Sequence, residues 1–402
     1  MSPLRIAQVC LSSMGGSSMV AVRLAEQLAR RGHYSFVLTD KPPFAGRQES
    51  EFPGIYGNPV QFISPPQEEH SVMGEMDLRG LALSQLIGNV AIEHHLDVIH
   101  VHYMLPLGIW ASSARTALSS NTALAVTFHG TDVINVPNGV RRIAAQALRH
   151  AELVTAVSDS VADQSMIEYG IKRPEVIRNW APMAEVDEAE LQESRNLRQG
   201  DELLLVHVSN FRPVKQATHC VEILARVNKK RPARLVLVGD GPDLSEVLEQ
   251  ARCLGLADRV VSLGRRTNPT SVVAACDFLL LPSQSEAVGL VILEAASVGV
   301  PTAAYYVGGI PEVVTDGVTG VLAAPNDTKS IAQGILRLAS DPQRYKTISS
   351  ECRNMARSLS PADIVEEYEN AYRTAIERRV AHICEPINLD RPFFLGNEPT
   401  FD

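Results

Sequence analysis

Short apolar runs alternate with longer helical stretches along most of this chain, and no other feature of the sequence restricts its fold as strongly. Runs of about four to eight residues separated by helices of ten or more predict parallel, doubly wound α/β units. The predicted strands are residues 5–11, 34–39, 97–102, 123–128 and 153–157 in the first half and 203–208, 234–238, 260–263, 278–282, 301–305 and 320–322 in the second.

The chain divides into two such units. Its 402 residues suggest two or three domains of about 150 residues each. A polar, acidic stretch over residues 180–200 separates the two series of strands and predicts a linker. We expect a first domain over residues 1–185, a second over 186–370, and within 371–402 a helix that returns to the first domain. Residues 385–402 lack periodicity and contain prolines, which predicts either an ordered extension or a frayed tail.

The composition argues against several classes of function. A net charge of −9 without any basic run disfavours binding to nucleic acid or to an anionic membrane. No apolar stretch approaches the roughly 18 residues of a membrane-spanning helix, and no signal-peptide core is present, so we expect a cytoplasmic protein. The six cysteines are scattered without metal-ligand spacing, which indicates small buried apolar residues.

A pair of glycines follows the first predicted strand. Gly15 and Gly16 stand directly before a predicted helix at residues 19–31. Glycines let the backbone approach a ligand, and a helix N-terminus offers free N–H groups and partial positive charge to a diphosphate. The third glycine of the dinucleotide-binding fingerprint is missing, which argues against a nicotinamide or flavin cofactor. The alternative is a purely structural turn.

Two cations follow the first predicted strand of the second half. Arg212 and Lys215 lie three residues apart at the carboxyl end of that strand, where open α/β sheets bind their ligands. From there they could neutralise a leaving diphosphate on the side opposite the glycine pair. The alternative is a solvated loop.

Two glutamates carry the most specific signal. Glu286 and Glu294 enclose seven residues, among them Gly289, at the start of a predicted helix. This spacing can place the first carboxylate at a loop tip, facing a sugar hydroxyl, and the second on the helix, facing a ribose diol. Carboxylate oxygens suit paired hydroxyls because both accept charge-assisted hydrogen bonds. The alternative is a pair of exposed helical acids, against which the intervening glycine and the Gly-Val-Pro turn at 299–301 argue.

The stretch from Glu286 to Glu294 resembles the E-x7-E motif of the retaining glycosyltransferases of family 4, and the resemblance covers about residues 5–375. These enzymes have the GT-B fold, in which two Rossmann-like, doubly wound parallel-sheet domains face a cleft. Within the family, the chain resembles the bacillithiol-pathway enzymes that join N-acetylglucosamine to L-malate. The segments that carry the likeness are MGGSSMVA (14–21), DVIHVHYMLP (97–106), TFHGTDV (127–133), VTAVSDS (154–160), HVSNFRPVK (207–215), LVGDGP (237–242), GLVILEA (289–295) and VGGIPEVV (307–314).

The resemblance implies a role for each matching residue, with the acceptor on the first domain and the nucleotide sugar on the second. It implies that Arg212 and Lys215 help the diphosphate leave, that Glu286 holds the sugar hydroxyls, and that His129 contacts the transferred sugar. These four form the implied catalytic set. The implied donor-binding residues are Gly15, Gly16, Glu294, Gly289, Leu290 and Val291, and the implied acceptor-binding residues are Ser17, Tyr103, Thr131 and Asn210.

The resemblance also implies a reaction. A sugar would move from a UDP- or GDP-linked donor to a small polar acceptor of a low-molecular-weight thiol or antibiotic pathway. Retention in the family is usually explained by front-face attack, in which the leaving phosphate takes the acceptor's proton while the protein positions the reactants and supports the departing charge. No base for an inverting attack is identifiable in the sequence, no metal or other cofactor is expected, and a homodimer is compatible with it.

The chain departs from the malate-linking enzymes at several matching positions. Leu107 stands where a histidine is expected, Gln216 where a basic residue is expected, and Ala287-Val288 where a Ser-Phe pair is expected. Residues 179–182, Asn-Trp-Ala-Pro, also differ. These changes remove positive charge and predict a reshaped acceptor wall. A second branch, which attaches an octose to the thiol ergothioneine in lincosamide assembly, therefore stands beside the malate-linking one.

Two alternatives come from outside glycosyl transfer. A sugar epimerase of the same two-domain shape would use a different set of acids and lacks this E-x7-E motif. A non-catalytic sugar-nucleotide binder would not need the complete set of Glu286, Glu294, Arg212 and Lys215. Product analysis with a sugar nucleotide separates both from a transferase.

Overall fold

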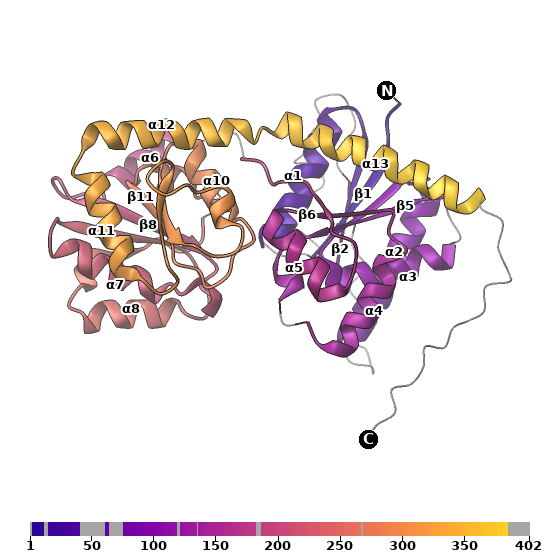
Figure 1. Ribbon diagram of the computed structural model, residues 1–402, viewed down its shortest axis with the longest axis horizontal. Coiled ribbons are helices and arrows are strands. Elements are labelled where there is room, and N and C mark those ends of the chain that lie inside the picture. Colours follow the sequence, from indigo (N-terminus) through magenta and orange to yellow (C-terminus); the bar gives the residue numbers. More distant parts are fainter. Residues whose placement is uncertain are drawn as a thin grey trace, which may run out of the picture.

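The computed structural model describes residues 2–11, 15–40, 61–63, 75–118, 121–134, 136–181, 186–266 and 268–384. It contains two parallel sheets, each covered by helices, in two lobes that lie side by side (Figure 1). The predicted α/β class with two doubly wound parallel sheets is therefore confirmed. Met14 of the glycine-rich loop, Pro182, and the predicted extension at 385–402 lie outside the described residues.

The first sheet has seven strands in the order β3-β2-β1-β4-β5-β6-β7. Its central strands are fully buried, as expected for parallel strands covered on both faces, and apart from His100 and His102 they consist of apolar and β-branched residues. The strands are β1 (Arg5–Cys10), β2 (Tyr34–Thr39), β3 (Gln61–Ile63), β4 (Val98–His102), β5 (Ala123–Phe128), β6 (Leu153–Ala156) and β7 (Glu175–Val176). The helices of this domain are α1 (Gly16–Arg30), α2 (Glu75–Glu93), α3 (Ile109–Leu118), α4 (Asn138–Leu148) and α5 (Asp159–Tyr169).

The second sheet has six strands in the order β10-β9-β8-β11-β12-β13. The strands are β8 (Leu203–Ser209), β9 (Ala233–Gly239), β10 (Val260–Ser262), β11 (Phe278–Leu281), β12 (Thr302–Tyr305) and β13 (Gly320–Ala323). Its helices are α6 (Glu188–Arg195), α7 (Thr218–Asn228), α8 (Leu244–Cys253), α9 (Thr270–Ala274), α10 (Leu290–Ser297), α11 (Thr328–Ala339) and α12 (Pro342–Ser358). Both sheets place the first strand of their domain at the point where the strand order reverses, and such switch points are where open α/β sheets bind ligands.

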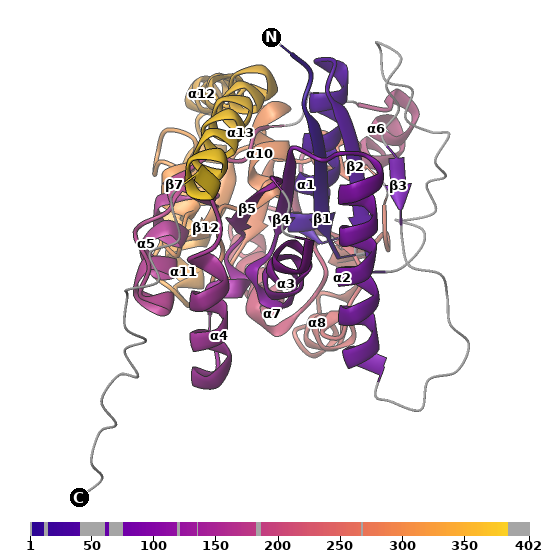
Figure 2. The ribbon, with the colours of Figure 1, turned by 90° about the vertical axis from the view of Figure 1, so that its right-hand side faces the viewer.

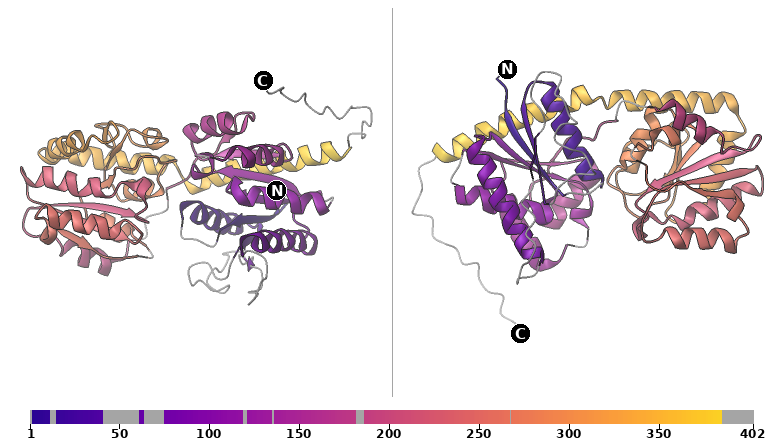
Figure 3. Two further views of the ribbon diagram at one scale, coloured as in Figure 1. Left: turned by 90° about the horizontal axis from the view of Figure 1, so that it is seen from below. Right: turned by 180° about the vertical axis from the view of Figure 1, so that it is seen from behind.

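The last helix, α13 (Pro361–Cys384), leaves the second domain and lies along the first (Figures 1 and 3). Its residues Val365, Tyr368 and Tyr372 are almost completely buried in a core shared with Ile6 and Val98 of the first sheet. Because this helix begins at Pro361, the return to the first domain starts earlier than residue 371. Viewed from the side of the first domain, α13 is seen nearly end-on at the upper edge of that domain, and the second domain lies behind (Figure 2).

Candidate active site

Two of the predicted site residues form an ion pair at the carboxyl ends of β8 and β11, which flank the switch point of the second sheet. Lys215 Nζ lies 2.6 Å from Oε2 of Glu286, and Ser283 Oγ donates a hydrogen bond to the same oxygen at 3.2 Å. The side chains of Lys215 and Glu286 are only 21% and 14% exposed. The residues predicted to hold the phosphates and the sugar thus form one charge-assisted pair.

Close packing of the segment at 237–242 holds the loop that carries the two cations. A Cβ atom at Gly239 would lie 1.9 Å from the carbonyl oxygen of Ser209, and one at Gly241 would lie 1.9 Å from that of Asn210. Only glycine fits at these two positions. The sequence segment LVGDGP therefore positions the cation-bearing loop through its backbone.

Arg212 acts across the boundary between the domains. It is exposed, and its positive charge reaches Tyr103 at the end of β4 in the first domain. Burial raises the pKa of Tyr103, while a hydrogen bond from its hydroxyl to Thr131 Oγ1 and the charge of Arg212 lower that pKa in part. One predicted catalytic residue and two predicted acceptor-binding residues therefore meet at the same place.

The N-termini of α1 and α10 lie beside each other at the junction of the domains. A Cβ atom at Gly16 would be 3.6 Å from Cδ1 of Leu290, which is the first residue of α10. Gly15 is the N-cap of α1 and Gly289 is the N-cap of α10, and neither cap uses a side-chain hydrogen bond. Two helix N-termini, with their partial positive charges, therefore converge where the sequence predicts a diphosphate.

Glu294 pairs with a residue that the sequence analysis did not identify. Nη2 of Arg23, on α1, lies 3.0 Å from Oε1 of Glu294, on α10. Burial raises the pKa of Glu294, and the charge of Arg23 lowers it in part. A ribose diol that binds Glu294, as the sequence predicts, would have to share this carboxylate with Arg23.

His129 follows β5 and is held from two sides. Its Nε2 lies 3.1 Å from Nδ1 of His102, and its backbone N–H donates to Asp132 at 3.1 Å. Asp132 also accepts from Gly130 N at 2.9 Å and from Met104 N at 3.1 Å. Burial lowers the pKa of His129 to about 3 and raises that of Asp132 to about 6. The ring of His129 is therefore neutral at pH 7, and Asp132 joins the loops after β4 and β5.

The loop after β5 touches the loop after β11. A Cβ atom at Gly130 would lie 2.8 Å from Cβ of Ala287, so the side chain of Ala287 fits against the first domain only because residue 130 is glycine. Behind it, a Cβ at Gly309 would lie 1.7 Å from the carbonyl oxygen of Ala287, and Gly309 N donates to Glu286 O at 3.0 Å. The loop of Glu286 is therefore clamped between the two domains.

The remaining predicted site residues lie near this junction with fewer contacts. Ser17 and Val291 are half-buried in the first turns of α1 and α10. Asn210 is exposed at the end of β8, and within the described part of the chain its side chain makes no hydrogen bond to another predicted site residue. The ligand contacts expected of Ser17, Val291 and Asn210 stay predictions.

Most of the departures from the malate-linking pattern do not line the junction, which corrects the expectation of a broadly reshaped acceptor wall. Leu107 is fully buried in the core of the first domain, and Asn179, Trp180 and Ala181 are also buried. Gln216 donates to Asn326 of its own domain at 3.2 Å. Of the differing residues that the structure describes, Ala287 packs against Gly130 of the first domain, and Ala181 donates a backbone hydrogen bond at 3.2 Å to Leu359, which follows α12 of the second domain.

Sequence reasoning missed Arg23, Asp132 and His102 as supports of the site. A signal for His102 was present, because His100 and His102 alternate along one strand and so share a face. Arg23 carries no comparable signal, since its partner Glu294 lies 271 residues away in the sequence. Asp132 stands three residues after His129 in the segment TFHGTDV, but its bond to the backbone of Met104 depends on the path of another loop.

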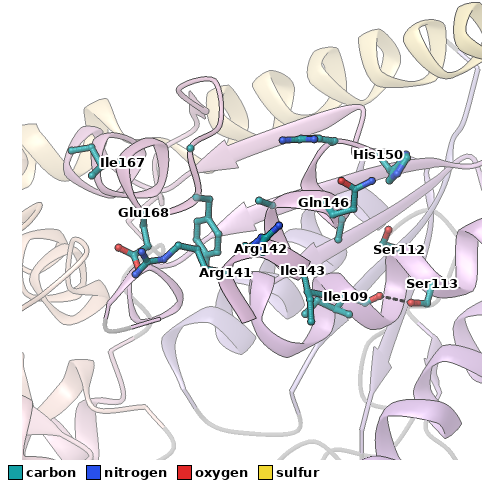
Figure 4. A pocket seen from close by; sticks show the side chains of 15 residues that line it. Ile109, Ser112, Ser113, Arg141, Arg142, Ile143, Gln146, His150, Ile167 and Glu168 are labelled. Carbon is teal, nitrogen blue, oxygen red and sulfur yellow. Dashed lines mark hydrogen bonds and ion pairs between the residues drawn. The ribbon is translucent and has the colours of Figure 1, made fainter. Parts of the chain in front are cut away.

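A second hollow, of about 860 Å³, lies on the outer side of the first domain between α3, α4 and α5 (Figure 4). Arg141, Arg142 and Gln146 of α4 line it, and Arg141 pairs with Glu168 at 2.6 Å. None of the predicted site residues lines this hollow. Its basic residues are solvated helix positions away from the junction.

The described residues contain no group of three or more His, Cys, Asp or Glu side chains that could hold a metal ion. No helix among them is both long and apolar enough to cross a bilayer.

Comparison with known proteins follows the same division into two domains. The family described as Glycosyltransferase Family 4 matches residues 14–184, and the family described as Glycosyl transferases group 1 matches residues 188–355. The N-acetyl-alpha-D-glucosaminyl L-malate synthase of Bacillus anthracis is 31% identical over 92% of this chain and 96% of its own length. A D-inositol 3-phosphate glycosyltransferase of Actinosynnema mirum is 29% identical over 90% of this chain and 92% of its own.

Solved structures share the whole architecture. Anabaena HepE in complex with UDP and glucose superposes with a TM-score of 0.76 at 23% identity, over 92% of this chain and 99% of the other. A sucrose-phosphate synthase of Thermosynechococcus elongatus gives a TM-score of 0.78 at 20% identity, over 93% of this chain and all of the other.

Two Rossmann-like domains that bring helix N-termini, a cation loop and paired carboxylates to their junction define a GT-B glycosyltransferase. The chain belongs to glycosyltransferase family 4, and it is an enzyme of glycosyl transfer.

Proposed function

We propose that this enzyme transfers a sugar, with retention, from a UDP- or GDP-linked donor to a small polar acceptor of a low-molecular-weight thiol or antibiotic pathway, without a metal ion. The observation that carries the proposal is the Lys215–Glu286 contact of 2.6 Å beside the converging N-termini of α1 and α10. Positive groups for a diphosphate and a carboxylate for sugar hydroxyls stand side by side there.

In this proposal the residues act mainly by position and charge. The acceptor's oxygen or sulfur attacks the anomeric carbon on the face from which the diphosphate leaves. The bond from that carbon to the phosphate oxygen breaks, and the acceptor's proton passes to the departing phosphate. Arg212, Lys215 and the two helix N-termini stabilise the charge that forms on the leaving group. Glu286 and His129 orient the sugar, and Glu294 orients the ribose.

The names of the relatives support a nucleotide-sugar donor and a small acceptor. The Bacillus anthracis relative is named for N-acetylglucosamine and L-malate, the Actinosynnema mirum relative is named for inositol 3-phosphate, and the Anabaena structure contains UDP and glucose. Since the side chain of Ala287 packs against Gly130 of the first domain at the junction, we propose that it contributes to the choice of acceptor.

The test is a matrix of donors and acceptors. The enzyme, treated with EDTA, is incubated with UDP- and GDP-sugars and with L-malate, inositol 3-phosphate or ergothioneine. We expect one acceptor to give a glycoside, whose anomeric configuration NMR then compares with that of the donor. An inverted product would overturn retention, and loss of turnover that only a divalent metal restores would overturn the metal-free mechanism.

Binding without turnover is the other informative outcome. A bound donor raises the melting temperature by mass action, so a thermal-shift series with the same donors reports binding independently of chemistry. Donor binding with neither transfer nor hydrolysis for any acceptor would indicate a sugar-nucleotide binder. Conversion of the donor to an epimer would indicate an epimerase.

A further inference from the structure

A buried chain of hydrogen bonds runs from His129 at the proposed active site to the C-terminal helix α13. His129 Nε2 lies 3.1 Å from His102 Nδ1, and His102 Nε2 lies 2.7 Å from Gln8 Oε1. Gln8 Nε2 donates to the Tyr372 hydroxyl at 3.3 Å, and that hydroxyl lies 2.7 Å from His100 Nδ1. The chain thus connects β1, β4, the loop after β5, and a residue 243 positions beyond His129 (372 minus 129).

The chain continues to a defined end inside the sheet. His100 Nε2 lies 2.7 Å from Thr127 Oγ1, which lies 2.6 Å from Thr155 Oγ1. Gln8, His100, His102 and Thr127 are at most 1% exposed, so water does not compete for these bonds. Every link between His129 and Thr155 is made by a protein group.

The direction of the chain follows from the amide of Gln8. Its Oε1 can only accept, so Nε2 of His102 must donate, and a neutral imidazole that donates at Nε2 must accept at Nδ1. His129 then donates from its Nε2. On the far side, Gln8 Nε2 donates to the Tyr372 oxygen, which leaves the Tyr372 proton for Nδ1 of His100. All donors therefore point away from the site.

Burial keeps the three histidines of the chain neutral. It lowers the pKa of His100 to about 3 and that of His129 to about 3, and it lowers the pKa of His102 well below its ordinary value. A protonated ring would have two donors, and one of them would face another donor inside the chain. A chain of neutral rings with a single direction satisfies both ring nitrogens of His100 and His102 and Nε2 of His129.

We propose that Tyr372 is a positioning residue, which acts through Gln8 and His102 to hold His129 in the tautomer protonated at Nε2. Nδ1 of His129 is then the acceptor that remains for a ligand, and a hydroxyl of the transferred sugar can donate to it. This inference rests on the proposed function for the identity of that ligand. The tautomer itself is a property of the free protein.

A second tyrosine of α13, Tyr368, provides the control variant for Tyr372. Tyr368 lies one turn before Tyr372, is 1% exposed, and packs its ring 5.5 Å from that of His100. Within the described residues its hydroxyl has no hydrogen-bond partner of good geometry, although it lies near Thr127 and Thr155. Tyr372→Phe therefore removes the oxygen that links Gln8 to His100, whereas Tyr368→Phe removes the same atom from a position beside the far end of the chain, beyond His100.

The experiment measures the tautomer and the kinetics separately. Nitrogen NMR of the uniformly labelled free protein should show His129 protonated at Nε2 in the wild type and in Tyr368→Phe, and a mixture of tautomers in Tyr372→Phe. For Tyr372→Phe we expect kcat to fall about tenfold with the donor KM changed less than about twofold, which is the size of one ordinary hydrogen bond. Tyr368→Phe should keep its kcat within about twofold.

A second variant breaks the chain from another element. Gln8→Met should reproduce the loss seen for Tyr372→Phe, and the double variant should be no slower than either single one, because both interrupt the same chain. Additive losses, a wild-type His129 protonated at Nδ1, or equal kinetics for the two tyrosine variants would overturn the proposal. If no acceptor is turned over, the NMR comparison still decides the tautomer, so failure of the proposed function remains distinguishable.

Discussion

The two domains differ in the charge and burial of the side chains at the carboxyl ends of their strands. In the first domain, most polar side chains behind the site are neutral and buried, with His100 and His102 at most 1% exposed and linked through Gln8 and Tyr372, and Asp132 is the buried carboxylate among them. In the second domain, the corresponding position holds a cation and a carboxylate, Lys215 and Glu286, which remain partly exposed. We call Gln8, His100 and His102 of the first domain the neutral wall, and Lys215 and Glu286 of the second domain the charged wall. Two domains of the same doubly wound topology therefore face the junction with different charge.

This difference matches the two kinds of group that the proposed reaction must handle. A leaving diphosphate accumulates negative charge, which fixed cations and helix N-termini stabilise most effectively. Sugar and acceptor hydroxyls stay neutral until the proton moves, and they need oriented hydrogen-bond partners instead. In the proposed reaction, charge is concentrated in the domain expected to bind the nucleotide, while the first domain supplies mainly directed, uncharged contacts.

The largest expected effect comes from the charged wall. Lys215→Met should lower kcat by about 10³-fold, because it removes a cation from the departing charge. Glu286→Gln should lower kcat/KM strongly through lost sugar contacts. In the double variant the losses should be less than additive, because each single change also leaves a charged partner unpaired. Initial rates with the preferred donor and acceptor provide the measurement.

The control for that series is a lysine of the same domain far from the site. Lys230 is exposed in the turn after α7, so Lys230→Met changes the net charge equally without touching the junction. It should retain full activity. Strictly additive losses at Lys215 and Glu286, or a loss at Lys230 as large as that at Lys215, would contradict the assignment of a specific charged pair.

Lowering the pH should destabilise the first domain, with its neutral buried histidines, more than the second domain. Burial lowers the pKa of His100 to about 3, that of His102 well below its ordinary value, and that of His207 in the second domain to about 4. Since the unfolded chain takes up these protons below about pH 6.5 and the folded chain does not, stability falls as the pH drops from 6.5. Each buried histidine should cost about 2 kcal/mol between pH 7 and pH 5.

The raised pKa of Asp132 makes its contribution to folding stability change with pH in the opposite direction. Its pKa is raised to about 6, so the folded state binds a proton before the unfolded state does, and stability rises by about 1 kcal/mol over the same interval. With two fully buried histidines and the partly exposed His129, the first domain should still lose more than the second. Native-state hydrogen exchange of β5 and β9 amides at pH 7 and pH 5 measures the two losses. Equal losses of stability in the two domains, or a larger loss at β9, would contradict the expected difference between the domains.

The sequence predicted the charged wall better than the neutral one. Glu286, Glu294, Arg212 and Lys215 are close in sequence to strand ends and glycines, so local patterns are sufficient to place them. The contacts behind His129 depend on the register of β1, β4 and β5 and on Tyr372, which reaches them only after the chain has passed through the second domain. No local pattern contains that information.

The same reason explains the errors at Leu107 and Trp180. Both were interpreted through their match to a family pattern at a site, and both are buried in the core of the first domain, with Leu107 at 0% and Trp180 at 5% exposure. Burial depends on which helices cover a segment. A motif can therefore predict that a residue is near a site without predicting which way its side chain points.

The smallest expected effect concerns Glu312, whose carboxylate links the second domain to the first. Glu312 of the second domain accepts hydrogen bonds from the backbone N–H groups of Asp159, at 3.0 Å, and Ser160, at 2.9 Å, in the first turn of α5 in the first domain. A carboxylate there also complements the positive end of the helix, an interaction worth about 0.5–1 kcal/mol. Glu312→Gln keeps the size of the side chain but removes its charge.

We expect Glu312→Gln to lower kcat/KM by about threefold, because that free energy favours the domain arrangement in which His129 and Lys215 face the same substrate. The substitution removes the charge of Glu312 and keeps the size of its side chain. The difference in kcat/KM between the wild type and the variant should therefore diminish in 0.5 M salt, because screening weakens the wild-type interaction. Glu351→Gln, on α12 of the second domain, is the matched control and should change nothing. A loss at Glu312 that is independent of salt would show that shape, and not charge, joins the neutral and charged walls.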